Sequence, residues 1–308
     1  MPCRRAAPRS FRAGFDADLI LDLLESHRGT VLLSVPTMLI RMLDAQRTRP
    51  RDLTAWRLAT LGGAPVPVEL VRRAEQELDV KVGIGFGQTE ASPYITHTLP
   101  DDPHPAWFAT VGRPLPLVEV KIADEAAGKP APVGATGEIC TRGICVMTEY
   151  FDDPAATSHA IDGDGWLHTG DVGTMDEQGY LRVQGRLKDM IIRGGENIYP
   201  REIEDVLFGH GAVVSASVVG LPDEEWGEIV AAFVQLRPGA AVGPGDLDQY
   251  CRAHLAGFKV PRVWDFVTEF PQTSSGKIQK FVLRQRYLDA AGVRHRTPDA
   301  AQPEDKTP

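Results

Sequence analysis

The sequence has few cysteines and no cysteine motif. Its 308 residues include four, Cys3, Cys140, Cys145 and Cys251, and no two of them form a Cys-x-x-Cys pair. A disulfide scaffold or a zinc site is therefore a poor fit, and a reducing cytoplasmic setting is the better one.

Long apolar runs and an excess of positive charge are also missing. No apolar run reaches the roughly 18 residues that a membrane-spanning helix needs, so we expect no transmembrane segment. The formal net charge is −9, from 33 basic and 42 acidic residues, which argues against a nucleic-acid partner. An anionic ligand must then be held by a local arrangement of residues. The remaining composition, 43% apolar and 24% charged, is typical of a globular enzyme.

Two familiar catalytic signatures are absent. The sequence has no Gly-x-Ser-x-Gly elbow, which disfavours an α/β-hydrolase. Ser275-Gly276-Lys277 is not a Walker loop, because Pro271 stands where that motif needs its first glycine and Ile278 follows the lysine. Lys277 must therefore act as a single point charge, which suits the neutralisation of a carboxylate–phosphate pair.

The first third of the chain alternates helical and strand patterns. Between residues 16 and 110, apolar residues at helical spacing alternate with short apolar runs, which predicts parallel strands joined by crossover helices. The first predicted helix has Leu19, Ile20, Leu23 and Leu24 on one face. Ligands collect at the carboxyl ends of such strands. Two predicted strands end in glycine loops, Gly62-Gly63-Ala64 and Gly85-Phe86-Gly87-Gln88-Thr89-Glu90.

The pattern changes twice further along. From 111 to 187, short strands at 118–122, 138–142 and 180–183, between Gly, Pro and Asp turns, predict a small antiparallel β-barrel. From Lys188 to 289 the pattern predicts a compact α+β unit whose last strand is expected over 263–270, so Lys188 is the predicted domain boundary. Residues 1–15, which carry four arginines and no acid before residue 13, are expected to form an irregular tail. A short transit-like segment is the alternative. Residues 290–308 are expected to be disordered.

The loop from Gly85 to Glu90 offers three chemical groups close together. A purine could stack on Phe86, Thr89 could donate to a phosphate, and the Glu90 carboxylate could bind Mg²⁺, a hard cation that prefers oxygen. The alternative is an ordinary glycine turn before a loop.

Three later segments each allow a functional and a structural interpretation. Asp171, after Thr169-Gly170, could accept both hydroxyls of a ribose or could be a plain turn residue. Arg186 could pair with phosphate or ribose, or form a surface ion pair, and Lys188-Asp189 could be a basic hinge or a solvated turn. Gly194-Gly195 favours close backbone approach to a ligand, or marks a helix entry. His168 is interpreted as structural.

Taken in order, these segments resemble the adenylate-forming superfamily, which comprises acyl-CoA synthetases, luciferases and peptide-synthetase adenylation domains. The resemblance runs from about Asp16 to Leu288. The stretch from Asp189 to Pro200 and the stretch from Gly276 to Phe281 resemble the medium-chain and fatty acyl-CoA synthetases most. The resemblance implies a large adenylate-forming domain, part α/β and part small barrel, followed by a mobile C-terminal α+β lid.

The resemblance also implies a role for each segment. It implies catalysis by Lys277, a hinge at Lys188 and a Mg²⁺ ligand at Glu90. Gly194 and Gly195 would line the CoA channel, while the nucleotide would be held by Gly62, Gly63, Ala64, Phe86, Gly87, Thr89, Asp171 and Arg186. The implied reaction joins a fatty or medium-chain carboxylate to CoA at the expense of ATP, through an acyl-adenylate.

One part of the family pattern is missing. Members have a Ser/Thr/Gly-rich phosphate loop well before the adenine loop, and this sequence has none. The sequence therefore resembles the C-terminal portion of a synthetase, whether as a fragment, a truncated reading frame or one half of a split enzyme. Two other functions stay open: a catalytically inactive AMP-binding remnant, and an adenylation enzyme that serves a separate acyl carrier protein.

Overall fold

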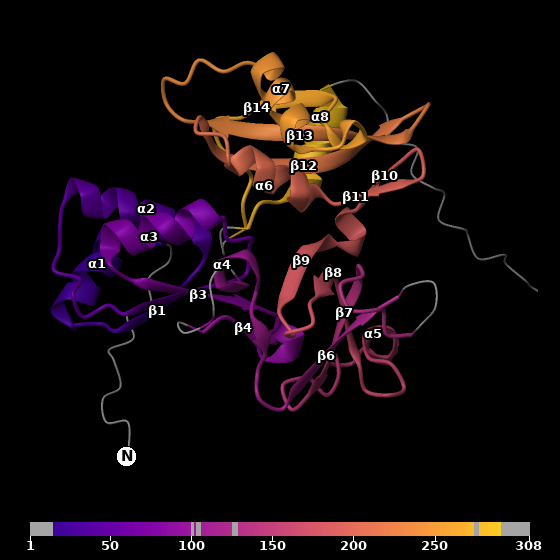
Figure 1. Ribbon diagram of the computed structural model, residues 1–308, viewed down its shortest axis with the longest axis horizontal. Helices are drawn as coiled ribbons and strands as arrows, with labels where there is room; N and C mark the ends of the chain where they lie inside the picture. Colours follow the sequence, from indigo (N-terminus) through magenta and orange to yellow (C-terminus); the bar gives the residue numbers. More distant parts are fainter. Residues whose placement is uncertain (1–14, 100–101, 103–105, 125–128, 274–276, 291–308) are drawn as a thin grey trace, which may run out of the picture.

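The computed structural model describes residues 15–99, 102, 106–124, 129–273 and 277–290. Residues 1–14 of the tail predicted over 1–15, the loop residues 274–276, and residues 291–308 of the stretch predicted to be disordered lie outside this set. The described elements form three sheets with their helices (Figure 1). Within the described residues, no helix is both long enough and apolar enough to cross a membrane.

The N-terminal part contains three parallel strands covered by helices, as the alternating pattern predicts. The strands are paired in the order β1-β2-β3-β4-β5, with β1 to β3 parallel and the short β4 and β5 antiparallel. Their bounds are β1 Val31–Ser34, β2 Leu58–Leu61, β3 Lys81–Phe86, β4 Thr96–His97 and β5 Arg113–Pro114. The helices here are α1 Ala17–Ser26, α2 Pro36–Thr48, α3 Val68–Leu78, the 3-10 helix η1 Thr89–Ala91, and α4 Ala106–Ala109.

Local sequence explains where these helices begin. The side chain of Asp16 caps α1 by accepting a hydrogen bond from the backbone N–H of Leu19. Pro36 stands at the first turn of α2, where its missing N–H costs nothing. The buried residues of α1, Leu21 and Leu24, pack with those of α2 and α3 against the sheet.

The middle part is antiparallel, as predicted, but it is an open sheet. The described strands pair in the order β6-β7-β8-β9, and no pairing between β9 and β6 closes them into the predicted barrel. The bounds are β6 Val118–Ala123, β7 Gly137–Gly143, β8 Leu167–Met175 and β9 Leu181–Arg186, with α5 Pro154–Ala160 before β8. Apolar side chains of this sheet, Ile122, Ile139 and Leu181, instead join the core of the N-terminal part.

The C-terminal part is one sheet covered on both faces. Its strands pair in the order β11-β10-β13-β12, and β14 also pairs with β13. Alternate residues of β12 and β13 point to opposite faces: Val218 packs under α6 and α7, while Val219 packs under α8. The bounds are η2 Leu187–Asp189, β10 Ile191–Arg193, β11 Glu196–Ile198, α6 Pro200–Phe208, β12 Val213–Asp223, β13 Gly227–Leu236, α7 Pro244–His254, η3 Gly257–Lys259, β14 Val263–Phe266 and α8 Lys280–Ala290.

Two predicted limits in this part need correction. The last strand, expected over 263–270, ends at Phe266, and Phe270 instead packs in the core beneath α8. Helix α8 runs to Ala290, one residue into the stretch predicted to be disordered. The placement of the domain boundary at Lys188 remains a prediction.

Candidate functional site

Two glycine loops meet at the carboxyl ends of β2 and β3. Because these strands are parallel neighbours, Gly62 and Gly85 come together, and a Cβ on Gly62 would lie 3.0 Å from the carbonyl oxygen of Gly85. Gly63 has φ +77°, a conformation that favours glycine. The partly buried ring of Tyr94, which the sequence did not single out, packs over both Gly62 and Gly85.

Lys277 reaches this loop from the far end of the chain. Its Cε lies 3.6 Å from the position a Cβ on Gly63 would take. The loop that carries Lys277 is held at its base, because the backbone N–H of Lys277 donates to Thr273 Oγ1 at 3.1 Å and Gln272 bridges to Ile278. The lysine side chain is exposed, so it is available to a ligand at the glycine loop.

The buried carboxylate of Asp171 pairs with the exposed guanidinium of Arg186 beside this region. They face each other across β8 and β9, and Arg186 Nε donates to Asp171 Oδ1 at 3.0 Å. Asp171 is 5% exposed, and the resulting desolvation raises its pKa. Arg186 and, further away, Lys277 oppose this rise, while Asp189 adds to it. The structure therefore places the Lys277 side chain beside the Gly63 turn and close enough to the Asp171–Arg186 pair to favour the ionised form of Asp171.

Glu90 lies on η1, directly after the glycine loop. The hydroxyl of Tyr150 donates to Glu90 Oε1 at 2.9 Å, and this bond is the main reason that the pKa of Tyr150 is raised. The backbone N–H of Met147 donates to the Glu90 carbonyl at 2.7 Å. Tyr150 has no sequence signal of its own, since it lies 60 residues from Glu90 in an irregular segment.

The rest of the predicted glycine loop has defined surroundings. Phe86 is half-buried at the end of β3, where it pairs with Thr96 of β4. A Cβ on Gly87 would lie 2.0 Å from the carbonyl oxygen of Pro93, so only glycine fits there. Thr89 is exposed at the start of η1, and Ala64 is half-buried after Gly63.

The hinge and channel residues lie elsewhere. Lys188 is exposed in η2, immediately after the last strand of the middle sheet. Gly194 and Gly195, with φ +59° and +88°, form the turn of the β10–β11 hairpin. Figure 1 shows this hairpin on the side of the C-terminal part away from the parallel sheet. The ring of Trp226 packs against Gly194, and Gly195 has open space around it.

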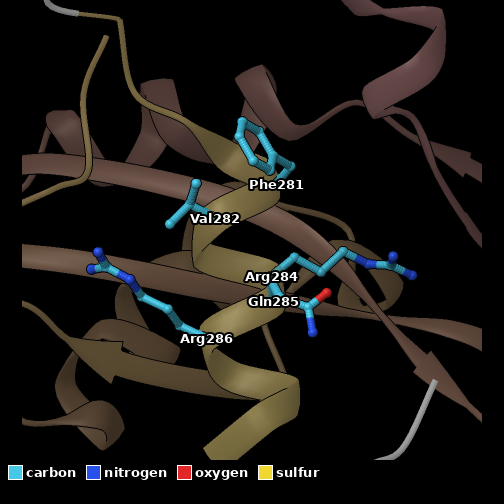
Figure 2. A pocket seen from close by; sticks show the side chains of 5 residues that line it. All are labelled: Phe281, Val282, Arg284, Gln285 and Arg286. Atoms are coloured by element: carbon cyan, nitrogen blue, oxygen red, sulfur yellow. The ribbon is translucent and has the colours of Figure 1, made fainter.

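A surface hollow of about 310 Å³ lies on α8 and contains none of these residues. Figure 2 shows its lining, which comes entirely from α8: Phe281, Val282, Arg284, Gln285 and Arg286. A hollow formed by one helix surface does not enclose a ligand, so it is not our candidate site.

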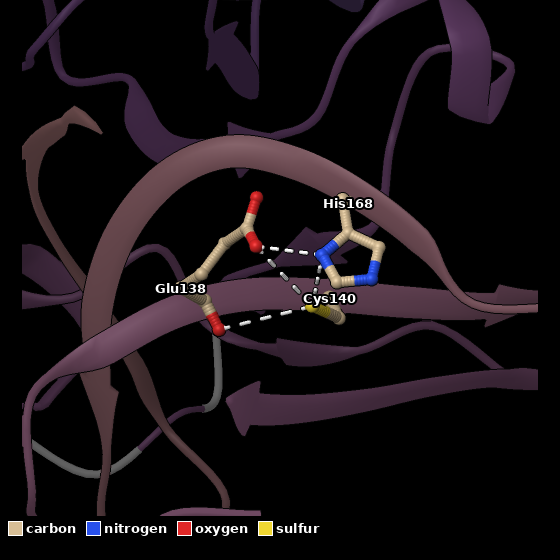
Figure 3. Close-up of side chains that lie close together, drawn as sticks. All are labelled: Glu138, Cys140 and His168. Carbon is tan, nitrogen blue, oxygen red and sulfur yellow. Dashed lines mark hydrogen bonds and ion pairs between the residues drawn. The ribbon is translucent and has the colours of Figure 1, made fainter. Parts of the chain in front are cut away.

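A possible metal-ligand cluster lies in the middle sheet. The ligand atoms of Glu138, Cys140 and His168 lie within 4.8 Å of one another (Figure 3). Burial raises the pKa of the Cys140 thiol to about 12, which disfavours the thiolate that binds metal. Both oxygens of Glu138 already accept protein hydrogen bonds, from Gly170 N–H and at His168 Nδ1. The cluster therefore links strands β7 and β8 through side-chain hydrogen bonds and is a poor metal centre.

The comparisons with known proteins agree with the sequence resemblance. Residues 6–151 match the family model of the AMP-binding enzyme, and residues 202–277 match that of its C-terminal domain. This chain belongs to the AMP-binding enzyme family, the adenylate-forming superfamily that the sequence predicted, and is similar to its acyl-CoA synthetases.

Two relatives illustrate the similarity. The Bacillus subtilis protein YngI, described as an acyl-CoA synthetase, is 45% identical over 89% of this chain and 50% of its own length. A mitochondrial medium-chain acyl-CoA ligase of Homo sapiens is 38% identical over 88% of this chain and 44% of its own length. This chain therefore spans about half the length of the curated relatives it matches.

Two solved structures of one similar protein superpose on this chain to different extents. ATP-bound MatB from Rhodopseudomonas palustris is 35% identical over 90% of this chain and 54% of its own, with a TM-score of 0.83. The apo structure of the same protein, over the same shares and at 36% identity, gives a TM-score of 0.70. This chain therefore superposes better on the ATP-bound structure than on the apo structure.

Proposed function

We propose that this chain carries the nucleotide and lysine elements of an acyl-CoA synthetase. The reaction is that of a fatty or medium-chain carboxylic acid with ATP and CoA, which gives acyl-CoA, AMP and pyrophosphate. The observation that carries the proposal is the position of the Lys277 side chain beside the Gly63 turn and near the Asp171–Arg186 pair. The medium-chain acyl class rests on the resemblance and on the name of the human relative.

In the first half-step a carboxylate oxygen attacks the α-phosphorus of ATP and pyrophosphate leaves. The Lys277 ammonium would neutralise the carboxylate and the α-phosphate, which otherwise repel each other. Gly62, Gly63, Ala64 and Gly87 would let adenine lie close to the backbone, with Phe86 stacked on it. Thr89 would contact phosphate.

Asp171, helped by Arg186, would accept the two ribose hydroxyls. This role suits a buried carboxylate whose Oδ1 accepts a hydrogen bond at 3.0 Å from Arg186, because that guanidinium opposes the rise in pKa caused by burial.

Glu90 fits a magnesium site because it offers a carboxylate, the hard oxygen donor that Mg²⁺ prefers. Tyr150 fixes one of its oxygens and so its direction. When bound, Mg²⁺ would neutralise phosphate charge as pyrophosphate forms.

In the second half-step the sulfur of CoA attacks the acyl carbonyl, AMP leaves and the thiol proton is lost. Gly194 and Gly195 would face the pantetheine chain, and the open space around Gly195 supports this role. Their hairpin lies away from Lys277, so residues 188–289 would have to rotate as a lid relative to residues 1–187, with Lys188 as the hinge.

The missing phosphate loop and the half length suggest that an N-terminal portion completes the enzyme. Strand β1 is the edge of the parallel sheet and pairs only with β2 among the described strands. Its Val31 and Leu33 are 46% and 63% exposed, unusual for apolar residues of a sheet. This edge is where we place the contact with that portion. The free cysteines Cys140, Cys145 and Cys251 support a cytoplasmic location.

The test is carboxylate-dependent ATP–pyrophosphate exchange by the purified chain, with and without the N-terminal portion of a relative. We expect little exchange by the chain alone, since loss of a single charge-stabilising contact costs on the order of 100-fold in rate. Exchange should appear when the portion is added. Robust exchange by the chain alone would remove the need for a partner, and none in either case would favour an inactive remnant.

The substitution Lys277→Ala tests the role of this lysine in the reconstituted enzyme, that is, this chain combined with the N-terminal portion of a relative. It should lower the rate of acyl-adenylate formation by about 100-fold or more, because one charge-stabilising group is lost. Thioester formation from a supplied acyl-adenylate should change far less. Equal loss in both half-reactions would refute the role given to Lys277. Transfer to a carrier protein in place of CoA would identify the other adenylation function.

A further inference from the structure

The ladder between β7 and β8 is interrupted where β8 carries Thr169-Gly170-Asp171. The register shifts between Glu138 and Cys140, so the residues opposite this point form a bulge. Gly170 in the bulge has φ +69°. Asp171, at its end, turns toward Arg186 of β9. The bulge therefore affects the position of the Asp171 carboxylate, because its backbone lacks the regular ladder to β7 there while Asp171 still pairs with Arg186 of β9.

Side chains of neighbouring residues replace the missing ladder bonds. The backbone N–H of Gly170 donates to Glu138 Oε1 at 3.0 Å. Glu138 Oε2 lies 2.6 Å from His168 Nδ1 (Figure 3). One carboxylate therefore holds the bulge on both sides of Thr169. Thr169 Oγ1 donates to the carbonyl of Ile139 at 2.7 Å and accepts from Asp171 N–H at 3.1 Å.

The carboxylate of Glu138 is itself well fixed. Its side chain is 13% exposed, and the other ring nitrogen of His168 lies 3.6 Å from the Asp162 carboxylate. Cys140 Sγ lies 3.6 Å from His168 Nδ1 and closes the cluster on its buried side. A mostly buried carboxylate with both oxygens hydrogen-bonded is part of a satisfied polar network, and such a network stiffens the backbone around it. We call this carboxylate the brace of the bulge.

We propose that Glu138, with His168, is a positioning residue for the ribose-binding carboxylate of Asp171. This inference rests on the proposed function of Asp171. It adds that Glu138 touches no ligand and acts by fixing the bulge. An error of about 1 Å in the place of a binding group can cost on the order of 100-fold, so loss of the brace should be visible in nucleotide affinity.

Two substitutions of Glu138 test whether its carboxylate holds the bulge, and a third substitution serves as the control. Glu138→Ala removes both anchors, while Glu138→Gln keeps the shape and an oxygen to accept the Gly170 N–H. Glu119→Ala is the control, because Glu119 is an exposed acid of the adjacent β6 whose partner is Arg142. Thermal midpoints are measured for all three, so that a folding defect is seen separately.

The first measurement needs no nucleotide. Hydrogen exchange of the backbone amides of Gly170 and Asp171 is compared between the variants and the unaltered chain. We expect about tenfold or faster exchange in Glu138→Ala, recovery in Glu138→Gln, and no change in Glu119→Ala. Unchanged exchange at Gly170 in Glu138→Ala would overturn the proposal.

The second measurement tests the link to ribose in the reconstituted enzyme. Affinities for ATP and for 2′,3′-dideoxy-ATP are compared. Glu138→Ala should weaken ATP about 10- to 100-fold and leave the dideoxy nucleotide nearly unchanged, as should Asp171→Ala. The double variant should be no weaker than Asp171→Ala alone. Equal weakening of both nucleotides would overturn the positioning role. An unaltered enzyme that does not distinguish the two nucleotides would instead refute the ribose role of Asp171.

Discussion

At the scale of single residues, several glycines of the site are required by space. Gly87 illustrates this, because a Cβ there would lie 2.0 Å from Pro93 O and 2.9 Å from the backbone nitrogen of Ile95. Neither atom belongs to a flexible side chain, so the backbone itself would have to move. Gly163 differs in that a Cβ there would meet nothing within 4 Å.

We therefore predict that Gly87→Ala destabilises the chain by about 1–3 kcal/mol, the usual cost of overpacking. Gly163→Ala should stay within about 0.5 kcal/mol of the unaltered chain, as surface substitutions do. Chemical unfolding followed by circular dichroism gives both values. A Gly87→Ala chain as stable as Gly163→Ala would show that the loop rearranges freely.

The sequence predicted the candidate site residues that belong to a recognisable motif. It missed those whose proposed role depends on a partner that is distant in the sequence. Gly62, Gly63 and Lys277 were predicted one by one, but their contact joins residues 214 positions apart, which no local pattern encodes. Tyr150 and Glu138 were missed because a hydroxyl or carboxylate in a strand or loop carries no signal until its partner is known. For the same reason the roles of all these residues remain proposals.

At the scale of elements, α1 and the end of α2 are joined by a cluster of charges. The guanidinium of Arg51, whose side chain is 2% exposed, contacts Asp18 and Asp22 of α1. Arg49 also donates to Asp22, at 2.6 Å. Hydrogen bonds from Arg49 and Arg51 lower the pKa of Asp22 below its ordinary value of 3.8. The cluster orients the two helices that cover the parallel sheet.

This pKa shift predicts an acid-dependent loss of stability. Because the folded pKa of Asp22 is lower than the unfolded one, its stabilising effect is complete above pH 3.8 and is lost as pH falls through the folded value. The fall in the urea midpoint from pH 7 to pH 3 should therefore be smaller in Asp22→Asn than in the unaltered chain.

Asp44→Asn is the matched control for that measurement. Asp44 of α2 makes only longer ion pairs, at 3.9 Å to Arg47 and 3.8 Å to Arg73 among the described contacts. Its substitution should leave the pH dependence almost unchanged. If Asp22→Asn and Asp44→Asn behave alike, the hydrogen-bonded cluster is not the source of the effect.

Most elements were predicted from apolar spacing, and the misses have physical causes. Strand β8 was missed because its residues from His168 to Thr174 are all polar or glycine except Val172, and its bulges break any alternation. In α1 the predicted face was centred on Leu19, Ile20, Leu23 and Leu24, whereas the fully buried residue is Leu21. Nearly every position of that helix is apolar or flanked by apolar residues, so only the sheet decides its rotation. Closure of the predicted barrel likewise depends on sheet curvature, which single strands do not encode.

At the scale of the whole molecule, the short helix η2 connects the middle sheet to the C-terminal part. Lys188 lies in its centre and is exposed. The proposed reaction requires one arrangement of the parts for Lys277 and another for Gly194 and Gly195. Large rotations of this kind are absorbed by a few backbone torsions at a hinge.

Lys188→Pro should therefore separate the two half-reactions in the reconstituted enzyme. Proline fixes φ near −65°, so adenylation should largely survive while thioester formation falls by about tenfold or more as the rotation becomes limiting. Lys188→Ala, which removes the charge but keeps the torsional freedom, should affect both steps little. Unchanged thioester formation in Lys188→Pro would place the pivot elsewhere.

The division of the described strands into three sheets determines how easily the C-terminal part can rotate. Among the described strands, none is hydrogen-bonded across residue 188, so no strand ladder links the C-terminal sheet to the other two. The Lys277–Gly63 contact is made by the tip of an exposed side chain. Rotation of the C-terminal part need not break any strand pairing. The arrangement needed for adenylation and the one needed for thioester formation can then differ in free energy by only a few kcal/mol. In the proposed reaction each substrate would then select its own arrangement through its differential affinity, and the bound ligand would set the order of the half-steps.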